Sequence, residues 1–214
     1  MATAEALISG VIGMVGNNPN TTSTVVLPLL NEGLRMITGR LLLPALEASA
    51  AVNTTLSANM SALPGNYQHG LFAAQDGTRK LSVKNSKAQM IDAFGDLTQT
   101  GDVSAVAVAE SKLMYLPIPA AVTALTIHYY RLPAVLVALA SPEGFSPQTV
   151  YYGELAMMHH AAARVWDDVE VGEDGDKVNT LHHEKQREAM IEQIRLITKE
   201  GVSRPSPPIV SCSW

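Results

Sequence analysis

Hydrophobic and polar positions alternate in one stretch of the chain, residues 103–131, whereas on both sides of it hydrophobic residues recur every three or four positions. Within this stretch, residues 122–131 place large apolar groups on one face and mixed groups on the other, as in a half-buried antiparallel strand. Pro117 and Pro119 lack the N–H group that a strand ladder needs, so they end a second strand that begins at Lys112. We therefore predict a small antiparallel β-meander over this stretch.

The helical periodicity predicts five helices, over residues 4–15, 22–38, 86–95, 147–170 and 177–200. Ser86 opens a capping-box pattern and Gly95 ends that helix, while Ser146 and Pro147 begin the fourth helix. A short acidic loop at residues 171–176 separates the last two helices, which we expect to form a helical hairpin.

The region between the second and third helices is rich in Ala, Ser, Asn and Thr, and we expect it to be largely irregular, with a strand around residues 51–58. An Asp76-Gly77 pair supplies the positive φ angles that a hairpin turn needs, so residues 71–74 and 80–83 are predicted to pair across it. The fold class is then α+β: a helical bundle with a C-terminal helical hairpin and a small antiparallel β-meander. Residues 1–200 are expected to form a single domain, and residues 201–214 an extended C-terminal tail.

Composition supports a buried core, because 47% of the 214 residues are hydrophobic and only 16% are charged. So few charges leave two interpretations open: neighbouring chains cover part of the surface, or the chain is a monomer with an Ala-rich core. The net charge of −5 and the absence of a basic cluster argue against sequence-specific DNA binding. Most of the charge lies late in the chain, where residues 164–200 hold ten acidic and six basic residues.

The one cysteine, Cys212, excludes a disulfide within the chain, so a reducing compartment is expected. The first 12 residues lack the basic start of a secretion signal. The most apolar segment, residues 113–127, contains two prolines and is shorter than the roughly 20 residues of a membrane helix. We expect a soluble cytoplasmic product with no membrane partner.

Two histidine pairs, at residues 159/160 and 182/183, raise the question of a metal site. Adjacent helical residues point about 100° apart, so at most one histidine of each pair faces a given direction. Neither helix supplies the i, i+4 spacing of a typical zinc site. We expect His159 to flank the apolar stripe and the other three histidines to be solvated, with no bound metal or cofactor.

No nucleophile, phosphate-loop or dinucleotide motif is present, and the acidic loop does not match a calcium-binding pattern. We therefore expect the chain not to be an enzyme. The tail instead carries exposed apolar groups in a segment too short to bury them, which favours docking on a partner, although a frayed end explains them equally well. The candidate docking residues are Arg204, Pro205, Pro207, Pro208, Ile209, Val210 and Trp214.

Four motifs, taken in order, resemble the head–tail adaptor (connector) proteins of tailed bacteriophages. They are LLNEGLRMI at residues 29–37, LPGNY at 63–67, LMYLPIPAAVTALTIHYYRLP at 113–133 and YYGELAMMHHAAARVWDDVE at 151–170. The resemblance implies a structural virion protein, assembled in the host cytoplasm, that sits at the head–tail junction. It also implies a ring, usually of twelve copies, between the portal protein and a tail, tail-terminator or nozzle protein, with a channel through which genomic DNA passes.

The resemblance further implies that the C-terminal extension reaches the portal, which favours docking for Arg204 to Trp214. Two alternatives remain. The first is a tail terminator or another tail ring or tube component. The second, from a different class, is a metal-dependent helical enzyme that uses His159 with His182 or His183.

Overall fold

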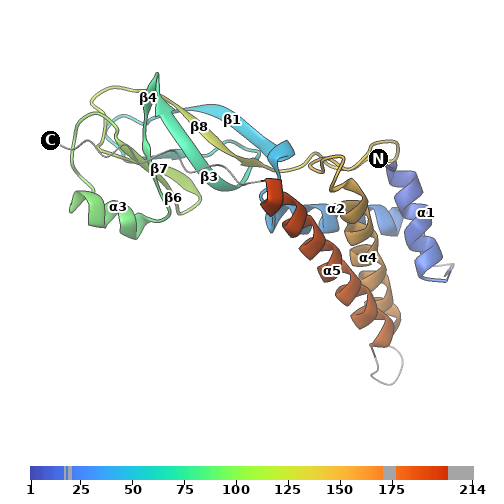
Figure 1. Ribbon diagram of the computed structural model, residues 1–214. Coiled ribbons are helices and arrows are strands. Elements are labelled where there is room, and N and C mark those ends of the chain that lie inside the picture. Colours follow the sequence, from blue (N-terminus) through green and yellow to red (C-terminus); the bar gives the residue numbers. More distant parts are fainter. Residues whose placement is uncertain (17, 19–20, 171–176, 202–214) are drawn as a thin grey trace. The chain divides into compact units, whose positions relative to one another are not determined.

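The computed structural model describes residues 1–16, 18, 21–170 and 177–201, with the side chains of residues 199–201 left out. It divides into two compact units. The helical unit comprises residues 1–37 and 135–214, and the sheet unit comprises residues 38–134 (Figure 1). That residues 1–200 act as one domain with a separate tail stays a prediction.

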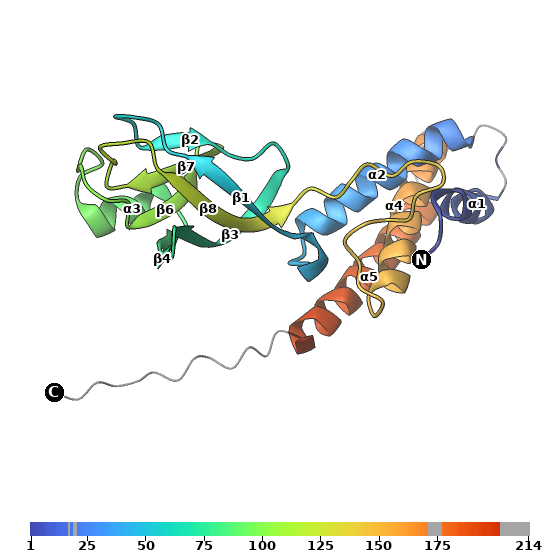
Figure 2. The same cartoon turned by 90° about the horizontal axis from the view of Figure 1, so that it is seen from above.

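The helical unit contains α1 (Ala4–Met14), α2 (Ser23–Gly39, which ends in the sheet unit), α4 (Val150–Glu170) and α5 (Val178–Gly201). Helices α4 and α5 lie side by side, consistent with the predicted hairpin (Figure 2). The core of the helical unit combines buried alanines of α4 with buried aliphatic side chains of the other helices, which include Leu7, Val11, Leu30, Leu34, Ile191 and Ile194. Among the described residues, no helix is long and apolar enough to cross a membrane.

Helix α4 begins at Val150, three residues later than predicted, because residues 147–149 form a turn. The Ser146 carbonyl accepts from the N–H of Val150 at 2.8 Å, so this turn leads directly into the helix. Gly153 is needed in the first turn of α4, since an added Cβ would lie 2.6 Å from the ring of Phe145.

An irregular segment, residues 135–140, crosses the helical unit before α4, and we call it the strap. It includes a turn in which the Ala140 N–H donates to the Val137 carbonyl at 2.9 Å. The Asn31 side chain holds it by accepting from the Leu136 N–H at 2.7 Å and donating to the Leu136 carbonyl at 3.1 Å. The Leu136 side chain is buried, whereas Val135, Val137 and Leu139 are 57%, 58% and 76% exposed. The strap therefore anchors one apolar side chain in the core and exposes three at the surface.

The sheet unit contains two four-stranded sheets, helix α3 (Lys87–Phe94) and a short 3-10 helix, η1 (Pro44–Leu46). The strand order of the first sheet is β1 (Glu47–Asn53), β8 (Ala124–Arg131), β3 (Tyr67–Asp76), β4 (Arg79–Lys80). That of the second is β2 (Met60–Ala62), β7 (Lys112–Leu116), β6 (Ala105–Ala109), β5 (Ser82–Lys84). Strands β5 and β6 are parallel, and the other described pairs are antiparallel. The α+β class is thus confirmed.

The predicted meander over residues 103–131 is wrong in its connectivity. Strands β6 and β7 form an antiparallel hairpin in the second sheet, but β8 lies in the first sheet between β1 and β3. The alternation along β8 was interpreted correctly, because Leu125, Ile127 and Tyr129 are buried. After the prolines that end β7, however, the chain crosses to the other sheet.

The region expected to be irregular supplies the edge strand β1, which pairs with β8 over seven residues, from Glu47↔Tyr130 to Asn53↔Ala124. The turn at Asp76-Gly77 is confirmed, with Gly77 at φ 57° and Asp76 paired with Arg79. Its second strand is shorter than predicted, because the chain leaves the first sheet after Lys80 and continues as β5 in the second.

Buried aromatic residues of the sheet unit have partners for their hydroxyl groups. The hydroxyl of Tyr115 accepts from the N–H of Thr55 at 2.6 Å and lies 3.1 Å from Ser61 Oγ. Tyr129 donates to Asn66 Oδ1 at 2.6 Å. These bonds offset the cost of burying the polar groups.

Helix α3 is capped as its sequence predicts. Ser86 Oγ accepts from the Gln89 N–H at 3.2 Å, and Gly95 ends the helix at φ 69°. This is the clearest case in which the local sequence alone determines an element.

Candidate interaction surfaces

The tail residues predicted to dock, Arg204 to Trp214, lie outside the described residues. Their role stays a prediction. The described residues offer a histidine-rich seam in the helical unit, and a pocket and an aromatic patch in the sheet unit.

The histidine-rich seam lies between α4 and α5. The Nδ1 atoms of His159 and His183 are 2.9 Å apart, so one ring donates to the other. Burial, and next the charges that His183 and His182 would carry, lower the pKa of His159 to about 4. Burial and His182 also lower the pKa of His183, against the opposing effect of Glu170. Two neutral imidazoles therefore face each other in the hairpin at neutral pH.

His160 points to a different neighbour, as expected for the next residue on a helix. It is only 5% exposed, with Nε2 3.4 Å from Glu32 Oε1 and Nδ1 3.4 Å from Arg187 Nη1. Burial lowers the pKa of His160, although the Glu32 carboxylate opposes this. Gly33 makes room for the ring, since a Cβ there would lie 3.0 Å from it.

Glu170, at the end of α4, caps the start of α5. Its carboxylate accepts from the N–H groups of Asn179 at 2.9 Å and Thr180 at 3.2 Å, and from the Thr180 hydroxyl at 2.7 Å. Desolvation raises the pKa of Glu170, but these hydrogen bonds outweigh it and the pKa is lowered. The hairpin is thus closed by a carboxylate at a helix N-terminus, where a negative charge is favoured.

Helical geometry allows at most one histidine of each pair to face a given direction, and His159 and His183 face each other. The expectation that the other three are solvated is wrong for His160 and His183, which are 5% and 8% exposed, because each packs between helices. Within the described part of the chain, no group of three or more His, Cys, Asp or Glu side chains is arranged to hold a metal ion. Among the described residues, the seam therefore offers two facing nitrogens without a third ligand.

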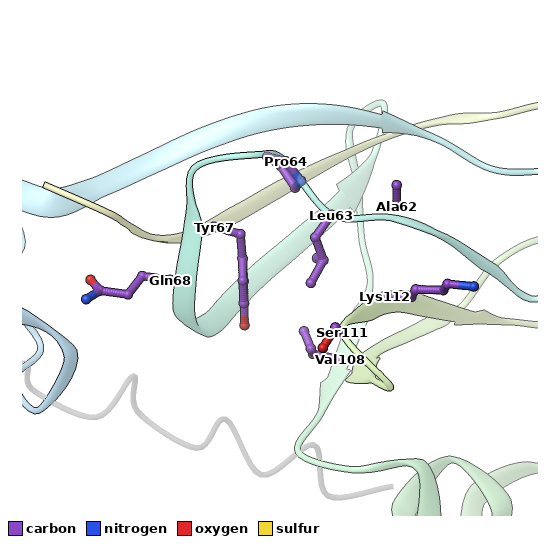
Figure 3. Close-up of a pocket in the computed structure, with 8 residues that line it drawn as sticks. All are labelled: Ala62, Leu63, Pro64, Tyr67, Gln68, Val108, Ser111 and Lys112. Carbon is purple, nitrogen blue, oxygen red and sulfur yellow. The ribbon is translucent and has the colours of Figure 1, made fainter. Parts of the chain in front are cut away.

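A pocket of about 540 Å³ opens in the sheet unit beside the start of β7. It is lined by Ala62, Leu63, Pro64, Tyr67, Gln68, Val108, Ser111 and Lys112. Figure 3 shows Leu63 extending toward Ser111 and Val108, with the Tyr67 ring beside it. Burial raises the pKa of Tyr67, against a hydrogen bond with Leu71. Lys112 is the charged side chain of the lining, which holds no carboxylate or imidazole and suits an apolar contact better than acid–base chemistry.

Four aromatic rings gather on the face of the first sheet opposite its core. His69 stacks on Tyr130 at 5.5 Å between centroids, and Phe72 lies 5.2 Å from Tyr130 and 6.1 Å from His128. We call His69, Phe72, His128 and Tyr130 the aromatic patch. Its most exposed member, Phe72, is 41% exposed, and Glu47 lies at one end, where its Oε1 is 3.5 Å from the Tyr130 hydroxyl.

A bulge in β3 builds this patch. His69 pairs with Tyr130 and Ala73 with His128, so β3 inserts extra residues opposite β8. Gly70 is at φ 65°, and a Cβ there would lie 2.8 Å from the Tyr130 ring. The bulge directs Phe72 onto the same face as the other rings, as bulges often do at binding sites.

The described surfaces are an apolar pocket, an aromatic patch and a seam of histidines in contact, as in a protein that acts by contact. The sequence model of the SU10 adaptor protein family matches residues 2–210. The chain belongs to the SU10 adaptor protein family. No curated protein matches it.

As an adaptor of this family, the chain is a phage virion component that interacts with other head and tail proteins. The resemblance to head–tail adaptors, drawn from four short motifs, is confirmed. Those motifs lie in α2, before and in β3, from β7 to just beyond β8, and in α4. The match also covers most of the predicted docking tail.

Sequence reasoning missed the aromatic patch of this adaptor. The mixed face that carries His128 and Tyr130 was visible in the alternation along β8. The partners His69 and Phe72 were not, because they reach this face through a bulge that no local pattern predicts. The glycine at position 70 was the available signal.

Proposed function

We propose that this adaptor is a non-enzymatic ring component at the head–tail junction. Copies of the chain, twelve in the simplest case, close a ring between the portal and the tail, and the genome passes through its channel. The observation that carries this proposal is the family match over residues 2–210. The α4–α5 hairpin is the element that the resemblance leads us to expect.

The charge distribution supports a channel that does not retain DNA. The helical unit carries 14 of the 20 acidic residues and 8 of the 15 basic residues of the chain. A wall with this balance repels a phosphate backbone, which lets DNA pass without being held.

The strap supports contact between copies. Val135, Val137 and Leu139 are three exposed aliphatic side chains within five residues, and residues 132–142 carry no charge. Exposed apolar groups gathered in this way are typical of interaction surfaces. We expect the neighbouring copy to cover them in the ring.

The tail is the proposed contact with the portal. Arg204 to Trp214 combine three prolines with Ile209, Val210 and Trp214, a composition suited to docking on a partner in an extended conformation. We expect the portal, on one side of the ring, to bind this segment.

Electron microscopy of the purified protein, alone and mixed with portal, tests this function. We expect closed rings that bind portal through one face. Leu139→Asp should prevent ring closure while the monomer stays folded, whereas Leu56→Asp, at a 58% exposed site in the sheet unit, should not. A protein that stays monomeric, leaves portal unbound and is absent from virions would refute the proposal.

The alternative is a tail terminator or another tail ring component. Such a protein would also form a ring, but that ring would bind tail-tube protein instead of portal. Binding to tail-tube protein but not to portal would favour this alternative.

A further inference from the structure

Strand β1 is an open edge of the first sheet to which the proposed ring and portal contacts assign no role. It pairs with β8 over seven residues, from Glu47 to Asn53, and within the described sheet unit no strand pairs with its other side. The backbone N–H and C=O groups on an open edge are a template for another strand.

The other edges of the two described sheets are short or charged. Strand β4 has two residues, Arg79 and Lys80, and both are exposed. Strands β2 and β5 have three residues each, and β5 ends in Lys84. Short edge strands and lysine side chains prevent edge-to-edge pairing. Strand β1 lacks this protection, because it is long, contains no proline or lysine, and pairs with β8 without a bulge.

The edge of β1 fits a second copy of itself. Antiparallel pairing about a two-fold axis at Ala50 places all seven residues of one copy opposite the seven of the other. Glu47 of each copy then lies opposite Asn53 of the other, so a carboxylate meets an amide and no like charges face each other. The edges of two or three residues on β2, β4 and β5 would leave most of these positions unpaired.

The same pairing keeps both faces of the sheet continuous. Successive residues of a strand point to opposite faces, and directly opposed residues share a face. The inward positions Ala48, Ala50 and Val52 therefore meet only inward positions of the other copy, and the exposed Ser49 and Ala51 meet each other. Since most of these side chains are small, the two backbones can approach to hydrogen-bonding distance.

We propose that the unassembled adaptor forms a dimer in which the β1 edges of two copies pair antiparallel about Ala50. The two first sheets then join into one sheet of eight strands. A single strand pair is a small contact beside the roughly 1,600 Å² of a standard interface, so the dimer dissociates readily.

The dimer protects the edge until the chain assembles. A two-fold contact cannot repeat around a cyclic ring whose copies all point the same way, so the dimer precedes the ring. This order of events rests on the proposed ring, whereas the pairing of the two edges does not.

Disulfide trapping tests the register of the two strands. All variants carry Cys212→Ser, which removes the single native thiol. In the proposed pairing the two Ala50 Cα atoms lie about 5 Å apart, within the range of a disulfide, so Ala50→Cys should form dimers on mild oxidation. Ser49→Cys is the matched control, because its two Cα atoms would lie about 8 Å apart, and it should give at least about tenfold less dimer although its site is more exposed.

Mixing two single variants gives an independent measurement of the same register. Ser49 of one copy lies opposite Ala51 of the other, so Ser49→Cys mixed with Ala51→Cys should form a mixed disulfide. Each of these variants alone should stay largely monomeric. Mass spectrometry of the unreduced digest identifies the linked peptides.

Sedimentation equilibrium measures the dimer without a covalent bond. The chains carry Leu139→Asp, which removes the proposed ring contact and leaves β1 unchanged. Ser49→Lys, which places a lysine on the edge, should weaken dimerisation at least about tenfold. Ile91→Lys, at a 41% exposed site on α3, should keep it within about twofold, as is usual for a surface substitution away from the contact. Circular dichroism checks that both variants fold.

The trapped dimer of Ala50→Cys together with the mixed disulfide would support the pairing. Equal trapping of Ser49→Cys alone, or dimerisation unchanged by Ser49→Lys, would overturn it. A chain that gives no Ala50→Cys dimer would overturn it in favour of a strand supplied by another protein. Rings that persist with Leu139→Asp would show that the proposed ring contact is misplaced, and the disulfide pattern would still report on β1.

Discussion

Acid should weaken the α4–α5 hairpin through His159. Its pKa is held near 4, against about 6.5 in an unfolded chain, so the unfolded state binds a proton over a range in which the native state does not. Stability is complete above pH 6.5 and is lost as the pH falls toward 4. His183 shifts in the same direction, and its neighbour across the 2.9 Å contact cannot accept a second positive charge without cost.

The size of the effect follows from this shift. Between pH 7.5 and pH 5, a difference of about 2.5 pKa units corresponds to about 2 kcal/mol of lost stability. His159 is only half-buried, and solvent screening reduces this to about 1 kcal/mol. His159→Gln, which cannot be protonated, should therefore unfold with a pH dependence smaller by about that amount.

Urea unfolding at the two pH values measures this difference. Fluorescence reports on α4 through Trp166, whose indole N–H is buried. His128→Gln, a half-buried histidine of the sheet unit, is the matched control and should follow the wild type. If His159→Gln lost stability with acid as steeply as the wild type, the seam would not be the acid-sensitive element.

Three further substitutions test packing and polar contacts by urea unfolding. Gly153→Ala should destabilise the helical unit by about 1–3 kcal/mol, because the Phe145 ring must move; no change would show that the ring has room. Asn31→Ala should cost about 1–2 kcal/mol by releasing both backbone groups of Leu136, and unchanged stability would contradict the account of the strap. Tyr115→Phe should cost about 1–2 kcal/mol, since it leaves the Thr55 N–H without the hydroxyl that accepts from it, and a neutral result would mean that this N–H finds another partner.

The helices could be predicted because their signals are local. Caps such as Ser86 and Gly95 act within a few residues, and apolar periodicity identifies the buried face of a helix without reference to the rest of the chain. The α4–α5 hairpin could be predicted from the apolar periodicity of two helices and the few residues between them. Only the first turn of α4 was misplaced, where three residues form a turn before the helix.

Strand partners could not be predicted, because pairing is set by contacts distant in sequence. Alternation along β8 showed which face is buried, but not that β1 and β3 flank it. Strand β1 reads EASAAVN, a composition of low strand propensity, and it is extended because β8 offers seven paired positions. Tertiary context thus overrides local preference in the sheet unit.

The candidate surfaces divide in the same way. The pairing of His159 with His182 or His183 entered only as part of the enzyme alternative, and the sequence did not predict that His183 is buried between two helices. The aromatic patch required the bulge after His69, and the burial of His160 required the approach of α2. Both depend on packing that no single segment encodes.

The most direct test of the central claim is a cryo-electron microscopy map of the virion neck. We predict a closed ring of this chain between portal and tail, with the α4–α5 hairpin recognisable in every copy and an open channel along the axis. A neck in which other proteins fill that position, or a virion that lacks the chain, would contradict the account.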